Sequence, residues 1–111
     1  MNRVVYIDDE SDICAVVDAT LRHAGIRVST HTDPTAALAD IHGDAPALVL
    51  CDYRMPGMSG LALLHRIESD VPFALISGDL EIHDIEEPRV VDVLRKPLRP
   101  EDLITFVQRY V

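Results

Sequence analysis

Residues 48–52 read Leu-Val-Leu-Cys-Asp, an uninterrupted apolar run that ends on the carboxylate of Asp52. A run of this kind is typical of a central strand in a parallel sheet, which helices cover on both faces. Three further apolar runs lead to polar side chains: residues 4–7 to Asp8 and Asp9, residues 73–76 to Ser77, and residues 93–94 to Lys96. Because parallel strands end at one edge of a sheet, we expect these side chains to meet there, where such sheets bind ligands.

Helix signals alternate with these strand signals along the chain. In chain order we expect a helix capped by Ser11 and stopped by Gly25, a strand over 26–31, a helix capped by Asp33 that ends at Gly43, a helix over 61–69, and a last helix from Pro100. Between residues 79 and 89 the helical phasing is poor and Pro88 prevents a helix from continuing, so we expect a short or distorted fourth helix there. This alternation predicts an α/β fold, a doubly wound parallel sheet with right-handed crossovers.

Size and composition limit the classes of function. A chain of 111 residues is long enough for one core, so we expect a single domain over residues 1–111. The net charge of -9 argues against a nucleic-acid partner, and no apolar stretch approaches the roughly 20 residues of a membrane span. Cys14 and Cys51 lack the spacing of a metal site, and we expect them to be reduced, buried thiols in a cytoplasmic protein.

The polar side chains at the sheet edge suggest a cation site beside an anion site. The charges of Asp8, Asp9 and Asp52 repel one another unless a cation relieves them, and hard oxygen ligands suit Mg²⁺. Asp52 is the candidate nucleophile for a phosphoryl group, and Lys96 and Ser77 are candidates to bind the phosphoryl oxygens. The alternative is purely structural, with Asp8 as a helix cap and Asp9 as a solvated acid.

Four segments in this order resemble the receiver domain of bacterial two-component response regulators. They are Val-Val-Tyr-Ile-Asp-Asp-Glu at 4–10, Leu-Val-Leu-Cys-Asp-Tyr-Arg-Met-Pro-Gly-Met-Ser-Gly at 48–60, Ile-Ser-Gly at 76–78 and Leu-Arg-Lys-Pro-Leu at 94–98. The resemblance covers the whole chain and implies a flavodoxin-like fold of five strands in the order 2-1-3-4-5. It also implies that Asp52 takes a phosphoryl group from a histidine of a sensor kinase or a phosphotransfer protein.

The same resemblance assigns the metal-binding and phosphoryl-binding residues, and position along the chain suggests two modulating ones. Asp9, Asp52 and the backbone carbonyl of Arg54 would hold Mg²⁺, with Asp8 acting through water. Ser77 and Lys96 would bind the phosphoryl group and report its presence. Arg54 and Asp79, each two residues beyond a strand end, are candidates to approach across the mouth of the site and to modulate the lifetime of the acyl phosphate.

Two departures from the family pattern concern the output of the domain. The family usually has Tyr or Phe three residues before the lysine, and here that position is Val93, so the aromatic part of the switch is missing. The interval from Ser77 to Lys96 is also shorter than usual. Both departures leave the phosphorylation site complete.

We therefore expect a receiver that accepts a phosphoryl group, loses it by self-catalysis, and otherwise is not an enzyme. It would bind a downstream protein or pass the phosphoryl group on, as a stand-alone receiver or as a piece of a longer regulator or hybrid kinase. Two alternatives are a degenerate receiver that acts only as an interaction module, and a Mg²⁺-dependent phosphatase with an aspartyl-phosphate intermediate. The phosphatase would need an acid where the chain has Arg54. The five histidines form no shared constellation, and we interpret them as spectators.

Overall fold

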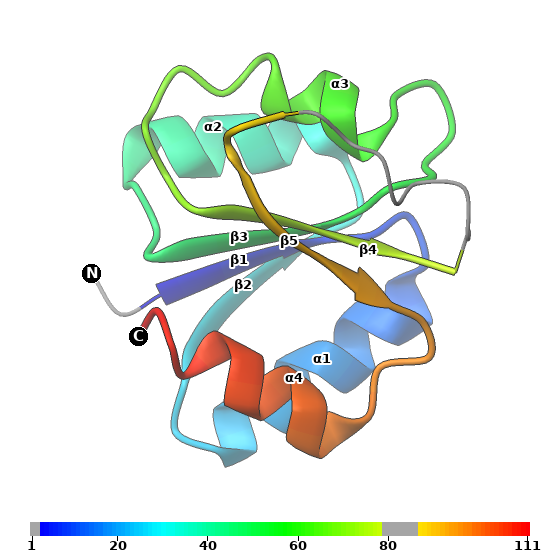
Figure 1. Ribbon diagram of the computed structural model, residues 1–111, viewed down its shortest axis with the longest axis vertical. Helices are drawn as coiled ribbons and strands as arrows, with labels where there is room; N and C mark the ends of the chain where they lie inside the picture. Colours follow the sequence, from blue (N-terminus) through cyan, green and yellow to red (C-terminus); the bar gives the residue numbers. More distant parts are fainter. Residues whose placement is uncertain (1–2, 79–86) are drawn as a thin grey trace.

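The computed structural model describes residues 3–78 and 87–111 (Figure 1). A five-stranded sheet has the order β2-β1-β3-β4-β5, and all of its neighbouring strands are parallel, so the predicted topology is confirmed. The strands are β1 (Arg3–Ile7), β2 (Arg27–His31), β3 (Leu48–Asp52), β4 (Phe73–Ser77) and β5 (Val90–Arg95). The described helices are α1 (Ser11–His23), α2 (Pro34–Gly43), α3 (Gly60–Leu64) and α4 (Pro100–Val107). The distorted fourth helix that the sequence predicts falls mainly on 79–86, outside the described residues.

Two hydrophobic clusters sandwich the sheet. Alternate residues along each strand face opposite sides, so Val4 and Tyr6 of β1 join the cluster under α1 and α4, whereas Val5 and Ile7 join the one under α2 and α3. Figure 1 shows the two pairs of helices on opposite faces. Three of the strands, β1, β3 and β4, place nearly all their side chains in these clusters, which explains their continuous apolar sequences. No helix within 3–78 or 87–111 is long and apolar enough to cross a bilayer.

The ends of the first two helices follow their predicted signals with one correction. Gly25 adopts a φ of 79° just beyond α1, and the Asp33 side chain accepts a hydrogen bond from the backbone of Thr35 at the start of α2. Ser11, however, is the first residue of α1 rather than its cap, which is Glu10 and makes no side-chain capping bond. The chain enters this helix through Asp8, whose Oδ1 accepts the Glu10 N–H at 3.0 Å.

The third helix is shorter than the sequence predicts. Apolar residues recur at helical spacing as far as Ile67, but α3 ends at Leu64. Beyond it the Arg89 guanidinium donates hydrogen bonds to the carbonyls of Leu64, Ile67 and Ser69, at 3.2, 2.9 and 3.0 Å. These carbonyls have a donor from a distant part of the chain, so the helix does not need to continue in order to satisfy them.

Gly60 brings the start of α3 close to the end of β3. Its N–H donates to the carbonyl of Tyr53 at 2.8 Å. A Cβ at this position would lie 2.8 Å from the backbone oxygen of Asp52 and 2.6 Å from a Leu75 methyl group, so no other residue fits without movement. The glycine therefore fixes the loop that follows Asp52.

The strand order reverses between β1 and β3, which are neighbours in the sheet. Ile7 lies opposite Cys51, so the chain leaves the two strands at Asp8 and Asp52 side by side. This is the switch point at which open α/β sheets bind their ligands.

Candidate functional site

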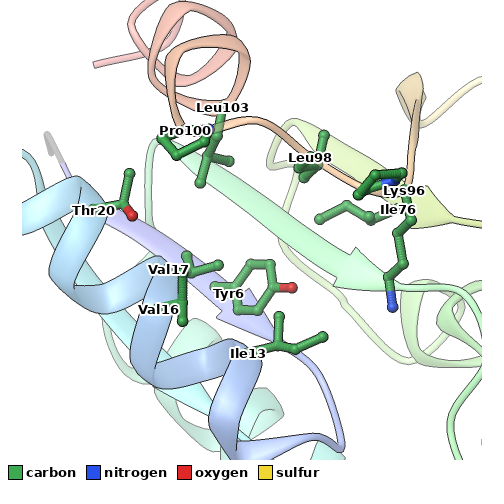
Figure 2. A pocket seen from close by; sticks show the side chains of 11 residues that line it. Tyr6, Ile13, Val16, Val17, Thr20, Ile76, Lys96, Leu98, Pro100 and Leu103 are labelled. Atoms are coloured by element: carbon green, nitrogen blue, oxygen red, sulfur yellow. The ribbon is translucent and has the colours of Figure 1, made fainter.

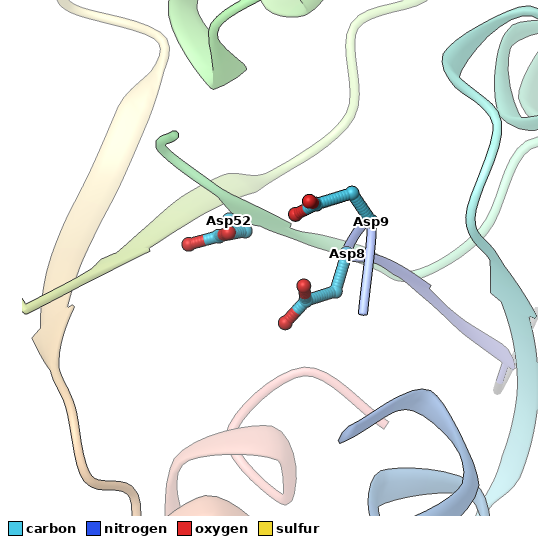
Figure 3. A group of neighbouring side chains, drawn as sticks. All are labelled: Asp8, Asp9 and Asp52. Atoms are coloured by element: carbon cyan, nitrogen blue, oxygen red, sulfur yellow. The ribbon is translucent and has the colours of Figure 1, made fainter. Parts of the chain in front are cut away.

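Three carboxylates converge at this switch point. Asp8, Asp9 and Asp52 each offer an oxygen, and these oxygens all lie within 4.8 Å of one another (Figure 3). Asp8 is fully buried and Asp52 is 5 % exposed, whereas Asp9 faces solvent. Three hard oxygen donors with one side open to water suit Mg²⁺, which keeps several water ligands. The convergence that the sequence predicts is confirmed among the described residues.

The carboxylate of Asp8 is held at both of its oxygens. The Tyr6 hydroxyl donates to Oδ2 at 2.9 Å, and the Glu10 N–H donates to Oδ1. Burial, followed by the charge of Asp8, raises the pKa of Tyr6 well above its usual value, so the phenol stays protonated and remains a donor. Asp8 is thus both a support for the start of α1 and a member of the acidic cluster, which combines the two sequence-based alternatives.

Lys96 provides the positive charge of the site. It follows β5 at the same edge of the sheet, and its Nζ lies 3.1 Å from Asp52 Oδ1 and 3.9 Å from Asp8 Oδ2. The peptide bond between Lys96 and Pro97 is cis. The ammonium therefore contacts two of the three carboxylates that the sequence places here.

The pKa values of Asp52 and Lys96 are both raised. Burial raises the pKa of the Asp52 carboxyl, Lys96 opposes this, and Asp8 and Asp9 raise it further. Burial alone would lower the pKa of Lys96, but the carboxylates of Asp52 and Asp8 outweigh it, so the pKa of the ammonium is raised. Burial is thus the main reason that the pKa of Asp52 is raised, and the neighbouring carboxylates are the reason that the pKa of Lys96 is raised. A divalent cation would relieve the repulsion among the carboxylates.

Of the other predicted site residues, Ser77, Arg54 and Val93 fall within the described part of the chain. Ser77 is buried at the end of β4, and its carbonyl accepts the N–H of Lys96 at 3.0 Å. Arg54 lies in the β3–α3 loop and lines a cavity of about 480 Å³. Val93 lies opposite Leu75 and packs on the α2 and α3 side of the sheet. Asp79 lies outside the described residues.

Sequence reasoning missed two contributors to the site. From the sequence, Tyr6 is simply one more apolar residue of a strand. Side chains two positions apart on a strand lie on the same face, however, so Tyr6 lies on the same face as Asp8. That spacing was the signal that could have found it. Cys14 was read as a buried thiol, and its Sγ also lies 3.4 Å from the Asp8 carbonyl, with burial raising its pKa to about 11.

The described histidines do not gather at the site. His31 lies 2.7 Å from Asp40, His65 lies 3.1 Å from Glu87, and His42 accepts the N–H of Glu68. His23 lies in the last turn of α1. His31 meets the acidic cluster through its backbone, whose carbonyl accepts the N–H of Asp8 at 3.1 Å. The interpretation of the histidines as spectators stays a prediction.

Comparison with known proteins identifies the family. The model of the response regulator receiver domain matches residues 4–108. The chain belongs to this family. Membership of this family accounts for the motifs in the sequence, the five-stranded fold and the acidic pocket.

Individual relatives support the assignment. The receiver is 34 % identical to the C4-dicarboxylate transport transcriptional regulatory protein DctD of Rhizobium meliloti, with 96 % of this chain and 24 % of that protein aligned. It is 28 % identical to the DNA-binding response regulator MtrA of Mycobacterium tuberculosis, over 96 % of this chain and 49 % of MtrA. The chain thus spans between a quarter and a half of the length of these relatives.

A solved structure agrees over the full length. The chemotaxis protein CheY4 of Vibrio cholerae superimposes with a TM-score of 0.88 at 26 % identity, covering 100 % of this chain and 99 % of that one. A receiver fold of this kind is therefore known both within longer regulators and as a chain of similar size.

Proposed function

We propose that Asp52 is the phosphoacceptor of this receiver and takes its phosphoryl group from a phosphohistidine on a sensor kinase or a phosphotransfer protein. The observation that carries the proposal is the position of Asp52 at the end of β3. Its carboxylate lies within 4.8 Å of two further carboxylates and 3.1 Å from an ammonium.

The residues around Asp52 suit an in-line transfer. The Asp52 carboxylate attacks the phosphorus, the P–N bond to the donor imidazole breaks, and the imidazole leaves with the electron pair of that bond. Lys96 then exchanges its contact with Asp52 for the phosphoryl oxygens, and the Ser77 hydroxyl donates to one of them. Donors that are already in place before the transfer stabilise the charge of the transferring group.

Magnesium fits the acidic cluster. Asp9, Asp52 and the backbone carbonyl of Arg54 would hold the ion, with Asp8 acting through a water ligand. The bound ion supplies positive charge next to the transferring phosphoryl oxygens. The support in this chain is the set of three converging carboxylates, which carry more negative charge than Lys96 neutralises.

The chemistry we propose is confined to the domain's own Asp52, including loss of the phosphoryl group by hydrolysis, with Arg54 and Asp79 modulating its lifetime. The phosphorylated domain would then act on a downstream protein or hand the phosphoryl group on. We place it in the cytoplasm, because Cys14 and Cys51 are buried and free of disulfides, as is typical of a reducing compartment.

A second candidate is a receiver that has become only an interaction module. Val93 favours it, because the branched, short side chain cannot make the movement of the family's aromatic residue. The arrangement of Asp52 and Lys96 favours a working phosphoacceptor. The phosphatase alternative would need an acid in place of Arg54, and we do not pursue it.

The two candidates differ in one experiment. The protein is incubated with Mg²⁺ and acetyl phosphate, and its intact mass is measured. We expect a gain of one phosphoryl group in the wild type and none in Asp52→Asn, whereas Asp102→Asn on the exposed first turn of α4 should behave as the wild type. A wild type that gains no mass supports the interaction module, and a gain retained by Asp52→Asn excludes Asp52 as the acceptor.

A further inference from the structure

We propose that Tyr6 is a positioning residue of the phosphorylation site: its hydroxyl fixes the Asp8 carboxylate, keeps Lys96 on Asp52 and thereby strengthens Mg²⁺ binding. The inference rests on the proposed function, because it gives a role to a side chain that contacts the cation site from behind. Tyr6 itself touches neither the phosphoryl group nor the metal in this account.

The contact between Tyr6 and Asp8 is almost fully shielded from water. Tyr6 is 1 % exposed and Asp8 is 0 % exposed, and the hydroxyl lies 2.9 Å from Oδ2. The ring packs in the cluster beneath α1, next to Ile13 and Val17 (Figure 2). A hydrogen bond between a phenol and a buried carboxylate has no competing water, so it holds the carboxylate in one orientation.

Tyr6 and Lys96 both approach the same oxygen of Asp8, Tyr6 as a hydrogen-bond donor and Lys96 as a more distant ionic partner. Asp8 Oδ2 lies 2.9 Å from the Tyr6 hydroxyl and 3.9 Å from Lys96 Nζ, and both side chains line the same cavity of about 510 Å³ (Figure 2). The nearer partner is the neutral one. The ammonium is left closer to Asp52, at 3.1 Å, than to Asp8.

The pairing of Tyr6 with Asp8, and of Lys96 mainly with Asp52, affects how tightly a cation binds. A buried carboxylate oxygen that loses its donor takes the next one within reach, and for Asp8 that donor is Lys96. An ammonium held by both Asp8 and Asp52 competes more strongly with Mg²⁺ for the same oxygens. Loss of the hydroxyl also frees the carboxylate to rotate. Both effects weaken binding of the metal.

The test compares Mg²⁺ binding by calorimetry in the wild type, Tyr6→Phe and Tyr110→Phe. Phenylalanine keeps the ring and removes only the hydroxyl, and Tyr110 near the C-terminus provides the same substitution away from the site. We expect about fivefold weaker Mg²⁺ binding in Tyr6→Phe, the effect of one hydrogen bond. We expect the wild-type dissociation constant in Tyr110→Phe.

A second measurement uses the wild type alone and so does not depend on whether Tyr6→Phe folds. The chain has three tyrosines, so tyrosine labelled with ¹³C at Cζ alone gives three carbon signals by NMR, which Tyr53→Phe and Tyr110→Phe assign by elimination. The Tyr6 signal should shift with Mg²⁺ at the dissociation constant that calorimetry gives, while the Tyr110 signal stays in place. A Tyr6 side chain that is not coupled to the cation site would not follow the metal.

Two results would overturn the inference. One is a folded Tyr6→Phe that binds Mg²⁺ as tightly as the wild type or more tightly. The other is a Tyr6 signal that stays unchanged at saturating Mg²⁺. Either result leaves phosphorylation of Asp52 in the wild type intact, so the failure of this inference is distinct from the failure of the proposed function. A wild type that binds no Mg²⁺ would overturn both.

Discussion

Three carboxylates and one ammonium share the sheet edge between β1 and β3. Asp8 and Asp52 are buried, and the positive charge within reach of both is Lys96. Burial, with Asp8 and Asp9 adding to it, raises the pKa of Asp52, and the nearby carboxylates raise the pKa of Lys96. At the scale of single residues, the site stores electrostatic repulsion that a divalent cation would remove.

Mg²⁺ should therefore stabilise the unphosphorylated protein. A ligand that binds only the folded state adds about 2.7 kcal/mol at a hundredfold excess over its Kd. Thermal melting in increasing Mg²⁺ should show a rising Tm in the wild type and in Asp102→Asn, and a much smaller rise in Asp9→Asn. A Tm that does not change with Mg²⁺, or that rises as much in Asp9→Asn as in the wild type, would contradict this explanation of the cluster.

Side chains far apart in the sequence tie the elements together. Arg3 of β1 lies 3.0 Å from Asp40 of α2, and His31 of β2 lies 2.7 Å from the same carboxylate. Arg3 also donates to Ser29 and to the backbone carbonyl of Asp44. This polar network connects α2 to two strands on one face of the sheet.

The network should make stability depend on pH. Burial alone would raise the pKa of Asp40, but His31 and Arg3 lower it below its usual 3.8. A carboxyl with a lowered pKa contributes stability above its unfolded pKa, and this contribution is lost as pH falls through the folded pKa. Asp40→Asn should cost about 1–2 kcal/mol at neutral pH by urea denaturation, and its deficit should shrink in acid.

The matched control for this prediction is Asp18→Asn. Asp18 forms an exposed ion pair with Arg22 on α1, at 2.8 Å. Exposed pairs of this kind contribute at most about 1 kcal/mol. The role assigned to the Asp40 network would be wrong if the two variants lost equal stability at neutral pH, or if the deficit of Asp40→Asn stayed constant into acid.

Arg89 has a similar role at the start of β5, where its guanidinium binds three carbonyls between α3 and β4. Arg89→Met should lower the free energy of unfolding by about 2 kcal/mol, because charged hydrogen bonds to part-buried carbonyls are lost. Arg66→Met, an exposed residue of the same type just beyond α3, should have little effect in the same urea titration. If Arg89→Met and Arg66→Met lowered the free energy of unfolding equally, the contacts of the Arg89 guanidinium would contribute nothing to stability.

Across the whole molecule, the sequence predicts features that depend on neighbouring residues better than features that depend on contacts between residues far apart in the chain. The positions of Asp8, Asp52, Ser77 and Lys96 followed from the rule that parallel strands end at one edge. The length of α3 did not, because the side-chain donors to the carbonyls at and beyond its end come from Arg89, far along the chain. Tyr6 was missed because its ring fits an apolar strand and its hydroxyl acts only on a partner that the fold brings near.

The response to phosphorylation should concentrate on the segment after β4. Ser77 moving toward a phosphoryl group would pull on Gly78 and the residues that follow, while Val93 has few rotamers and is packed on the α2 and α3 side of the sheet. Hydrogen exchange with and without beryllofluoride should differ most between residues 78 and 90. Unchanged protection there, with a response over residues 100–111 instead, would contradict this account of the switch.

Chemical trapping of the phosphorylated residue identifies the acceptor directly. After reaction with acetyl phosphate and Mg²⁺, borohydride reduces an aspartyl phosphate to homoserine, which peptide mass spectrometry then locates. The account predicts homoserine at position 52 in the complete reaction and none when Mg²⁺ is omitted. Homoserine at another acid such as Asp8 or Asp9, or none at position 52 despite a gain in mass, would contradict it.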